Sequence, residues 1–233
     1  MKALLYKEFK LAMHPICYVF ILFFPLMILI PSYPLGIGFI YVLTCYPILF
    51  LGANKGQQSN DLLYSTLMPV RKKDIVLARI ITVITIQVAF MLLMTALYPL
   101  ARYISINISE QTQEEIEAVM STVPGIGLDG FVSLLAIAFI GFALADLIFF
   151  PIYYKNGKSI VMSTLLTILG FIIYIGVFTI ALPYIFDGFN DIFVNLSRLW
   201  IQFVFLGVAI LISTLLHFTV YKISAKRLEQ VDF

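Results

Sequence analysis

The sequence is poor in charge and in the residue types that form most catalytic sites. Asp, Glu, Lys and Arg together make up 12% of its 233 residues, and it has two histidines, two cysteines and one tryptophan. About a quarter of the residues in a soluble domain are charged. The composition therefore excludes an ordinary water-soluble fold.

The few cysteines and histidines do not form a recognisable metal or disulfide pattern. Cys17 and Cys45 lie within apolar runs, where a free cysteine packs as a small apolar residue. His14 and His217 lie near predicted span ends, and no Cys, His or carboxylate cluster surrounds either one. We expect no metal site and no disulfide.

The sequence also lacks a nucleotide-binding loop. The segment NGKS at 156–159 is similar to the end of a phosphate-binding loop, but that pattern requires Gly at the position of Ile152. The segment also follows a predicted membrane helix, whereas the phosphate-binding loop follows a strand. We therefore expect no catalytic residues and no cofactor in this chain.

Long apolar runs are what the sequence has in abundance, since 61% of it is hydrophobic. About 20 apolar residues in a helix cross a hydrocarbon core of roughly 30 Å. Six runs approach or exceed this length: 15–33, 35–53, 75–100, 131–154, 160–183 and 199–221. Pro25 interrupts the first run, which a membrane helix tolerates when it packs against neighbours. The sequence predicts an all-α polytopic membrane protein with six transmembrane helices.

The distribution of cations predicts the orientation of these helices. With six spans, both termini lie on the same side of the membrane. Thirteen of the fifteen Lys and Arg residues fall on that side, and only Arg102 and Arg198 fall on the other. Because cytoplasmic loops carry the excess of Lys and Arg, both termini are predicted to be cytoplasmic.

The segments outside the runs belong to a single membrane domain, 1–233. Residues 1–14 have an amphipathic pattern that predicts a helix in the cytoplasmic interface; a plain basic flank of the first span is the alternative. Residues 101–130 form the longest predicted outer loop. Residues 184–198 mix aromatics with Asp and Asn, which is typical of an interfacial or re-entrant segment.

Two polar side chains fall inside the predicted spans. Asp146 lies in FALADLIFF, and Gln87 lies in the third run. A carboxylate at this depth costs about 3 kcal/mol unless it faces water, a partner or the protein interior. Either residue is then part of a substrate path or an interhelical hydrogen bond, and for Gln87 the second role is favoured. Gly141 and Ala145, four residues apart, predict close packing of the same helix.

A polar stretch, NKGQQSNDLLYSTLMPVRKKDIV at 54–76, separates the second and third runs. Its helix-capping residues, its apolar residues at helical spacing and its terminating proline predict a short amphipathic helix. These residues are Ser59, Asn60, Asp61, Leu62, Leu63, Leu67, Met68 and Pro69. Arg71, Lys72 and Lys73 then meet the lipid headgroups. The apolar side of this helix either lies on the membrane or docks into another protein.

This stretch, with LLYKEF before the first run, resembles the permease subunits of ABC-2-type ATP-binding-cassette exporters. The resemblance covers the whole chain in topology, and its specific residues are concentrated in 54–80. It implies that the loop 54–74 carries a coupling helix seated in a cleft of an ATPase subunit. The small, loop-poor form looks most like the permeases of bacterial peptide-toxin exporters, such as that for phenol-soluble modulins.

The resemblance also implies residue roles. The positions that match the loop pattern are Asn60, Asp61, Tyr64, Ser65, Pro69 and Arg71, with Leu62, Leu63 and Leu67 as the apolar side. Lys7 and Glu8 match an N-terminal pair, and with Lys72 and Lys73 they are expected at the membrane interface.

The implied assembly is a permease dimer, homo- or heteromeric, in a bacterial cell membrane. Each copy binds an ATPase subunit that holds ATP and Mg, and no nucleic acid takes part. The implied cargo is amphipathic or hydrophobic, cytolytic or antimicrobial peptides included. The alternative is a stand-alone carrier or a toxin-immunity membrane protein. A carrier usually shows several intramembrane ionisable groups, and the sequence indicates Asp146 and little else.

Overall fold

The computed structural model describes residues 2–12, 19, 22, 23, 25, 26, 29, 70–106, 130–156, 160–186 and 199–230. Within these ranges the chain is helical and contains no strand. This agrees with the predicted all-α class. Most of the first two predicted spans, the coupling loop as far as Pro69, and most of the two outer segments lie outside the described residues.

Three described helices are long and apolar enough to cross a membrane: α5 (Lys72–Ile106), α7 (Phe131–Asn156) and α11 (Leu199–Glu229). A fourth helix, α8 (Ile160–Gly176), continues through the π-helical turn η4 (Val177–Ala181) into α9 (Leu182–Ile185). These helices cover the last four of the six predicted runs. The chain is thus a helical membrane protein, and the number of six spans stays a prediction.

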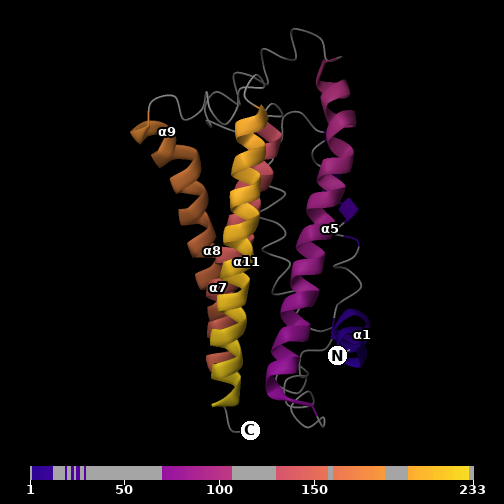
Figure 1. Cartoon of the computed structure of the whole chain (residues 1–233), viewed down its shortest axis with the longest axis vertical. Coiled ribbons are helices and arrows are strands. Elements are labelled where there is room, and N and C mark those ends of the chain that lie inside the picture. The colour runs from indigo at the N-terminus through magenta and orange to yellow at the C-terminus, as the bar shows by residue number, and fades with distance from the viewer. Residues whose placement is uncertain are drawn as a thin grey trace.

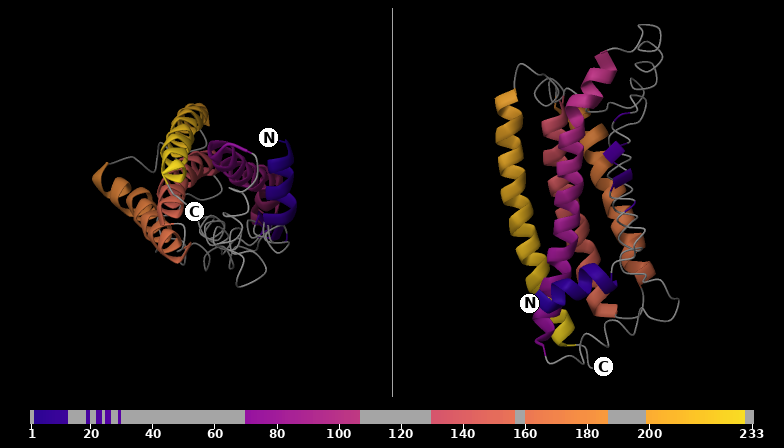
Figure 2. Two further views of the ribbon diagram at one scale, coloured as in Figure 1. Left: turned by 90° about the horizontal axis from the view of Figure 1, so that it is seen from below. Right: turned by 90° about the vertical axis from the view of Figure 1, so that its right-hand side faces the viewer.

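The long helices run side by side and alternate in direction (Figure 1). Helix α7 packs against both α8 and α11, and α11 also packs against α5. Helix α5 begins at the end of the bundle where α7 and α11 finish. The short N-terminal helix α1 (Lys2–Lys7) and its π-helical continuation η1 (Glu8–Ala12) lie beside α5 at that same end (Figure 2). Both described ends of the chain therefore lie at one end of the bundle, which we call the base.

Aromatic side chains of α7 fill the interior near the base. Phe149, Phe150 and Tyr154 are completely buried, and the ring of Phe149 stacks on Tyr153 with centroids 5.8 Å apart. Many apolar side chains on α8 and α11 instead remain exposed on the surface of the chain. An apolar outer surface of this length suits contact with lipid or with another membrane helix.

The close packing predicted at Gly141 is confirmed. A Cβ atom on Gly141 would lie 2.9 Å from ring atoms of both Phe171 and Tyr174 on α8. The hydroxyl of Tyr174 donates a hydrogen bond of 2.8 Å to the backbone carbonyl of Ile137. A small residue on α7 thus lets two aromatic side chains of α8 approach its backbone.

Several helix ends differ from the predicted boundaries. Helix α5 continues to Ile106, so the first residues of the predicted outer loop 101–130 are helical, and α9 continues to Ile185, inside the predicted outer segment 184–198. Helix α11 extends to Glu229, eight residues beyond the predicted run. Hydropathy marks where a helix leaves the membrane, whereas the helix itself continues through good helix formers such as Lys, Arg and Glu.

The N-terminal segment is helical as predicted, over residues 2–12. Leu4 is buried and forms a small apolar cluster with Ile75 and Ala78 of α5. Glu8 is also buried. The helix therefore packs against the base of α5 through Leu4 and Glu8, and the interfacial position of Glu8 stays a prediction.

Candidate functional site

Two clusters of buried polar side chains join the helices, and both involve α5. We call the first the base clamp, formed by Glu8, Arg79 and Tyr153. We call the second the interhelical triad, formed by Gln87, Asp146 and His217.

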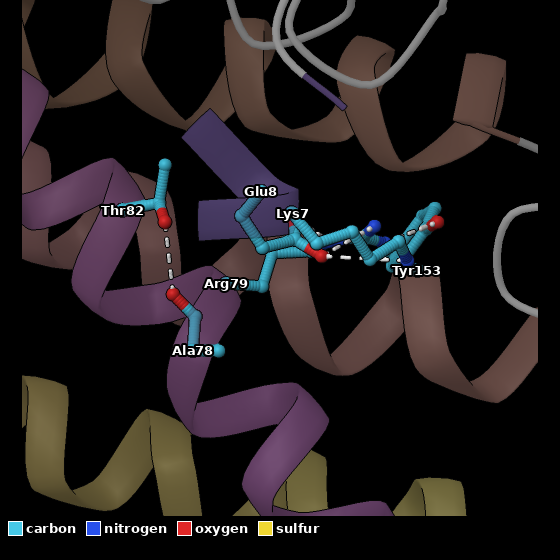
Figure 3. Close-up of polar contacts among 6 residues, drawn as sticks. All are labelled: Lys7, Glu8, Ala78, Arg79, Thr82 and Tyr153. Carbon is cyan, nitrogen blue, oxygen red and sulfur yellow. Dashed lines mark hydrogen bonds and ion pairs between the residues drawn. The ribbon is translucent and has the colours of Figure 1, made fainter. Parts of the chain in front are cut away.

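The base clamp connects three segments that are distant in sequence. Arg79 Nε donates to Glu8 Oε2 at 3.0 Å, and Arg79 Nη2 donates to Glu8 Oε1 at 3.3 Å. The remaining amino group of the same guanidinium, Nη1, donates to the hydroxyl of Tyr153 at 3.1 Å. Arg79 thus reaches both the N-terminal helix and α7 (Figure 3).

Burial makes this ion pair energetically important. Arg79 is 2% exposed and Glu8 3% exposed. Two charges removed from water are costly unless their geometry is good, and losing one partner leaves an uncompensated buried charge. The two parallel N–H···O bonds supply the required geometry, because the planar guanidinium matches a carboxylate. The clamp therefore holds the N-terminal helix firmly to α5.

The flanking cations are placed differently from Arg79. Lys7 lies near the clamp, with Nζ 3.9 Å from Glu8 Oε1. Lys72 is half-buried in the first turn of α5, and Arg71 and Lys73 are exposed. Because α5 already begins at Lys72, the predicted loop 54–74 ends at Arg71. These cations lie where this loop, 54–71, enters the base of α5, which is compatible with the predicted headgroup contact.

The interhelical triad joins α5, α7 and α11. Gln87 Nε2 donates to Asp146 Oδ2 at 3.1 Å, and His217 Nε2 lies 2.9 Å from the same oxygen. His217 Nδ1 lies 2.7 Å from the backbone carbonyl oxygen of Ser213, one turn earlier in α11. The Asp146 carboxylate is completely buried, and Gln87 is 4% exposed.

The triad lies well inside the bundle. Gln87 comes fifteen residues after the start of α5, Asp146 ten before the end of α7, and His217 twelve before the end of α11. At a rise of 1.5 Å per residue these positions are about 22, 15 and 18 Å from the base ends of their helices. The three helices therefore bring their polar side chains to similar distances from the base.

The structure brings together the two residues proposed for a substrate path. Asp146 and Gln87 lie in direct contact, and the interhelical hydrogen bond expected under one interpretation is present. A substrate group would have to displace these partners to reach the carboxylate. The substrate-path role stays a prediction. The coupling residues from Asn60 to Pro69 lie outside the described residues.

Sequence reasoning missed Arg79, Tyr153 and His217. The count of cations treats Arg79 as cytoplasmic, although its position inside the apolar run 75–100 points to a buried partner. The sequence pattern places His217 near a span end and indicates no partner for it. A signal was available, because α7 and α11 run in the same direction. Asp146 and His217 lie at similar distances before the ends of these two helices.

Metal binding finds no support among the described residues, where no three His, Cys, Asp or Glu side chains lie close enough to share an ion. The comparisons with known proteins add no identification: no protein-family model, no curated protein and no solved structure matches this chain.

Proposed function

We propose that this chain is the membrane-spanning permease subunit of an ATP-driven exporter, powered by a separate ATPase subunit at the base of the bundle. The observation that supports it is the base clamp, which joins the N-terminal helix, α5 and α7 by Arg79. The clamp lies at the end of α5 that receives the polar loop 54–71. The resemblance of that loop to ABC-2-type permeases supplies the class.

The clamp gives the loop a mechanical connection to the membrane helices. Helix α5 begins at Lys72, directly after the loop, and Asp74 N–H donates a hydrogen bond of 2.9 Å to the carbonyl of Arg71 at its first turn. A displacement of the loop by an ATPase would therefore act on the first turn of α5. Because Arg79 lies two turns further along and binds Glu8 and Tyr153, the N-terminal helix and α7 would move with it.

The exposed apolar surfaces support the proposed cargo and the proposed dimer. The exposed faces of α8 and α11 carry Leu, Ile, Phe and Val side chains, so a path lined by such helices between two permease copies would favour amphipathic or hydrophobic substrates. Cytolytic or antimicrobial peptides satisfy this requirement better than sugars or ions. The proposed location is a bacterial cell membrane.

The proposal is tested by reconstituting the chain in lipid vesicles with a candidate ATPase subunit, for which a gene next to that of the chain is the first place to search. Arg79→Met combined with Glu8→Met leaves no unpaired buried charge. It should leave ATPase binding intact but remove the stimulation of ATP hydrolysis by an amphipathic cationic peptide, because the connection from loop to bundle is broken. Lys73→Met removes an exposed cation close by and should retain stimulation. If the double variant couples as well as the unaltered chain, the clamp does not transmit movement.

A second function, a stand-alone proton-driven carrier, is favoured by one observation. The interhelical triad places two ionisable groups, Asp146 and His217, in contact at membrane depth, and such groups are typical of proton pathways in carriers. Vesicles containing this chain without an ATPase distinguish the two functions. Uptake driven by a pH gradient and abolished by a protonophore would support the carrier; transport that requires ATP and the second subunit would support the exporter.

A further inference from the structure

We propose that Asp146 and His217 form a binding site for one exchangeable proton within the membrane, with Gln87 orienting the carboxylate. The site depends on three helices, because each of its side chains comes from a different one: α5, α7 and α11. Its ligand is the proton itself, and the hydrogen-bond donors and acceptors around His217 and Asp146 show where that proton lies.

The first proton of the site is fixed on His217 Nδ1. A backbone carbonyl oxygen can only accept a hydrogen bond, and Nδ1 lies 2.7 Å from the carbonyl oxygen of Ser213. Nδ1 therefore carries a proton and donates it. The Ser213 hydroxyl lies 3.3 Å from the same nitrogen and is a secondary contact.

A second proton is required between His217 Nε2 and Asp146 Oδ2, which are 2.9 Å apart. Without it, the lone pair of Nε2 would face a carboxylate oxygen, and the two atoms would repel each other. With it, the site is either an imidazolium beside a carboxylate or a neutral imidazole beside a carboxylic acid. Both arrangements have no net charge, and both allow Gln87 to donate to Oδ2.

The surrounding helices offer little charge that could replace this proton. Along α5 the nearest ionisable residues are Arg79, already bound to Glu8, and Tyr98. Along α7 the nearest is Tyr153, along α11 it is Tyr221, and α8 contributes Tyr174 but no charged residue. The sequence from 15 to 53 contains no Asp, Glu, Lys, Arg or His. The buried site is therefore neutral when it holds the proton and carries one negative charge when it does not.

Release of the proton to water would leave that negative charge in a region of low dielectric. The packing of α11 against α7 shown here is therefore the packing of the protonated site. Proton loss must be accompanied by separation of these helices or by entry of water between them. The link between this separation and the movement of a substrate rests on the proposed transport function; the proton site itself does not.

The test uses the full chain in lipid nanodiscs, with ring-¹⁵N-labelled histidine and with His14→Gln so that His217 is the one histidine left. The ¹⁵N shift of each ring nitrogen shows whether it is protonated. We expect Nδ1 to be protonated throughout a titration from about pH 5 to pH 9, a range chosen around the ordinary histidine pKa. As the pH rises, Nε2 should change from the protonated or proton-sharing state to the unprotonated state, and each chain should release one proton.

Two variants serve as controls. Asp146→Asn keeps a side chain of the same shape but cannot share a proton, so the Nε2 transition should be lost. Leu215→Ala changes an exposed position of α11 outside the site and leaves both ionisable groups, so the transition should survive. If Asp146→Asn does not fold, the His14→Gln chain alone still decides.

Three outcomes would overturn the proposal: a neutral His217 protonated on Nε2 and bare on Nδ1, the absence of any Nε2 transition, or an identical transition in Asp146→Asn. The measurement needs no ATPase, nucleotide or substrate. A failure of the exporter proposal would therefore leave this result unchanged, and a failure here would leave ATPase coupling unaffected.

Discussion

At the scale of single residues, buried charged side chains form the main polar contacts between the helices. Arg79 and Glu8 are almost completely buried, and two guanidinium nitrogens of Arg79 donate hydrogen bonds to the two carboxylate oxygens of Glu8. Replacing both members of such a pair by apolar residues is often nearly neutral, whereas removing one is strongly destabilising. The pair therefore allows a clear test by double substitution.

We predict that Arg79→Met lowers the free energy of unfolding by about 3–5 kcal/mol, because Glu8 then remains buried without its partner. Adding Glu8→Met should restore most of the loss. Lys73→Met, at an exposed position, should change the stability by less than about 0.5 kcal/mol. Unfolding in mixed micelles with increasing denaturing detergent measures all four proteins. Equal losses in the single and double variants would show that the pair is not coupled.

The sequence predicted part of this residue-scale picture. Asp146 stands out because a carboxylate inside an apolar run must face water, a partner or the protein interior, and the structure buries it against Gln87 and His217. The partner itself, His217, is 71 positions away along the chain, and no local pattern connects the two. The same holds for Glu8 and Arg79, whose contact arises only when the N-terminal helix packs on α5.

At the scale of helices, the α7–α8 contact depends on the absence of a side chain at Gly141. The rings of Phe171 and Tyr174 occupy the space that a Cβ atom would need, whereas no atom of the described residues outside its own helical turn lies within 4 Å of a Cβ built on Gly207 of α11. The two glycines are both inside helices and differ in what surrounds them.

We expect Gly141→Ala to destabilise the protein by about 1–3 kcal/mol, the usual cost of overpacking a filled contact. Gly207→Ala should instead be neutral or stabilising by roughly 0.5–1 kcal/mol, because alanine loses less backbone entropy in a helix. Thermal unfolding of both variants in the same detergent makes the comparison. Similar effects of the two substitutions would mean that α8 does not press on α7 at Gly141.

Helix positions were easier to predict than helix ends. Apolar runs located α5, α7, α8 and α11 because a membrane helix must be about 20 residues long and apolar. The ends at Ile106 and Glu229 were not located, since residues beyond the membrane can stay helical without being hydrophobic. The amphipathic pattern of residues 1–14 identified a helix there, but only the structure shows which of its residues face α5.

At the scale of the whole molecule, the described ends of the chain lie together at the base (Figure 1). The count of cations predicts that the base is cytoplasmic. Lys73 is exposed there, and Glu115 falls in the predicted outer loop.

Cysteine labelling tests the orientation in a background with Cys17→Ser and Cys45→Ser. We predict that Glu115→Cys reacts with a membrane-impermeant maleimide in intact cells, and that Lys73→Cys reacts only after permeabilisation. Because the predicted six-span topology places thirteen of the fifteen cations on one side, the orientation should be uniform. The opposite pattern would place the base outside the cell and remove the cytoplasmic docking of an ATPase.

The proposed function depends most directly on the loop that precedes α5. If residues 60–68 form a coupling helix, Leu63 and Tyr64 are its buried anchors, and truncating such anchors typically costs about 2 kcal/mol or more of binding free energy. Surface lysines near headgroups contribute only about 1 kcal/mol each.

The decisive measurement is co-purification of the ATPase subunit with the chain, together with peptide-stimulated ATP hydrolysis. Leu63→Ala with Tyr64→Ala should release the ATPase and abolish stimulation while membrane insertion stays normal, and Lys72→Gln with Lys73→Gln should have a much smaller effect. A Leu63→Ala, Tyr64→Ala chain that still retains and fully stimulates its ATPase would contradict the exporter proposal.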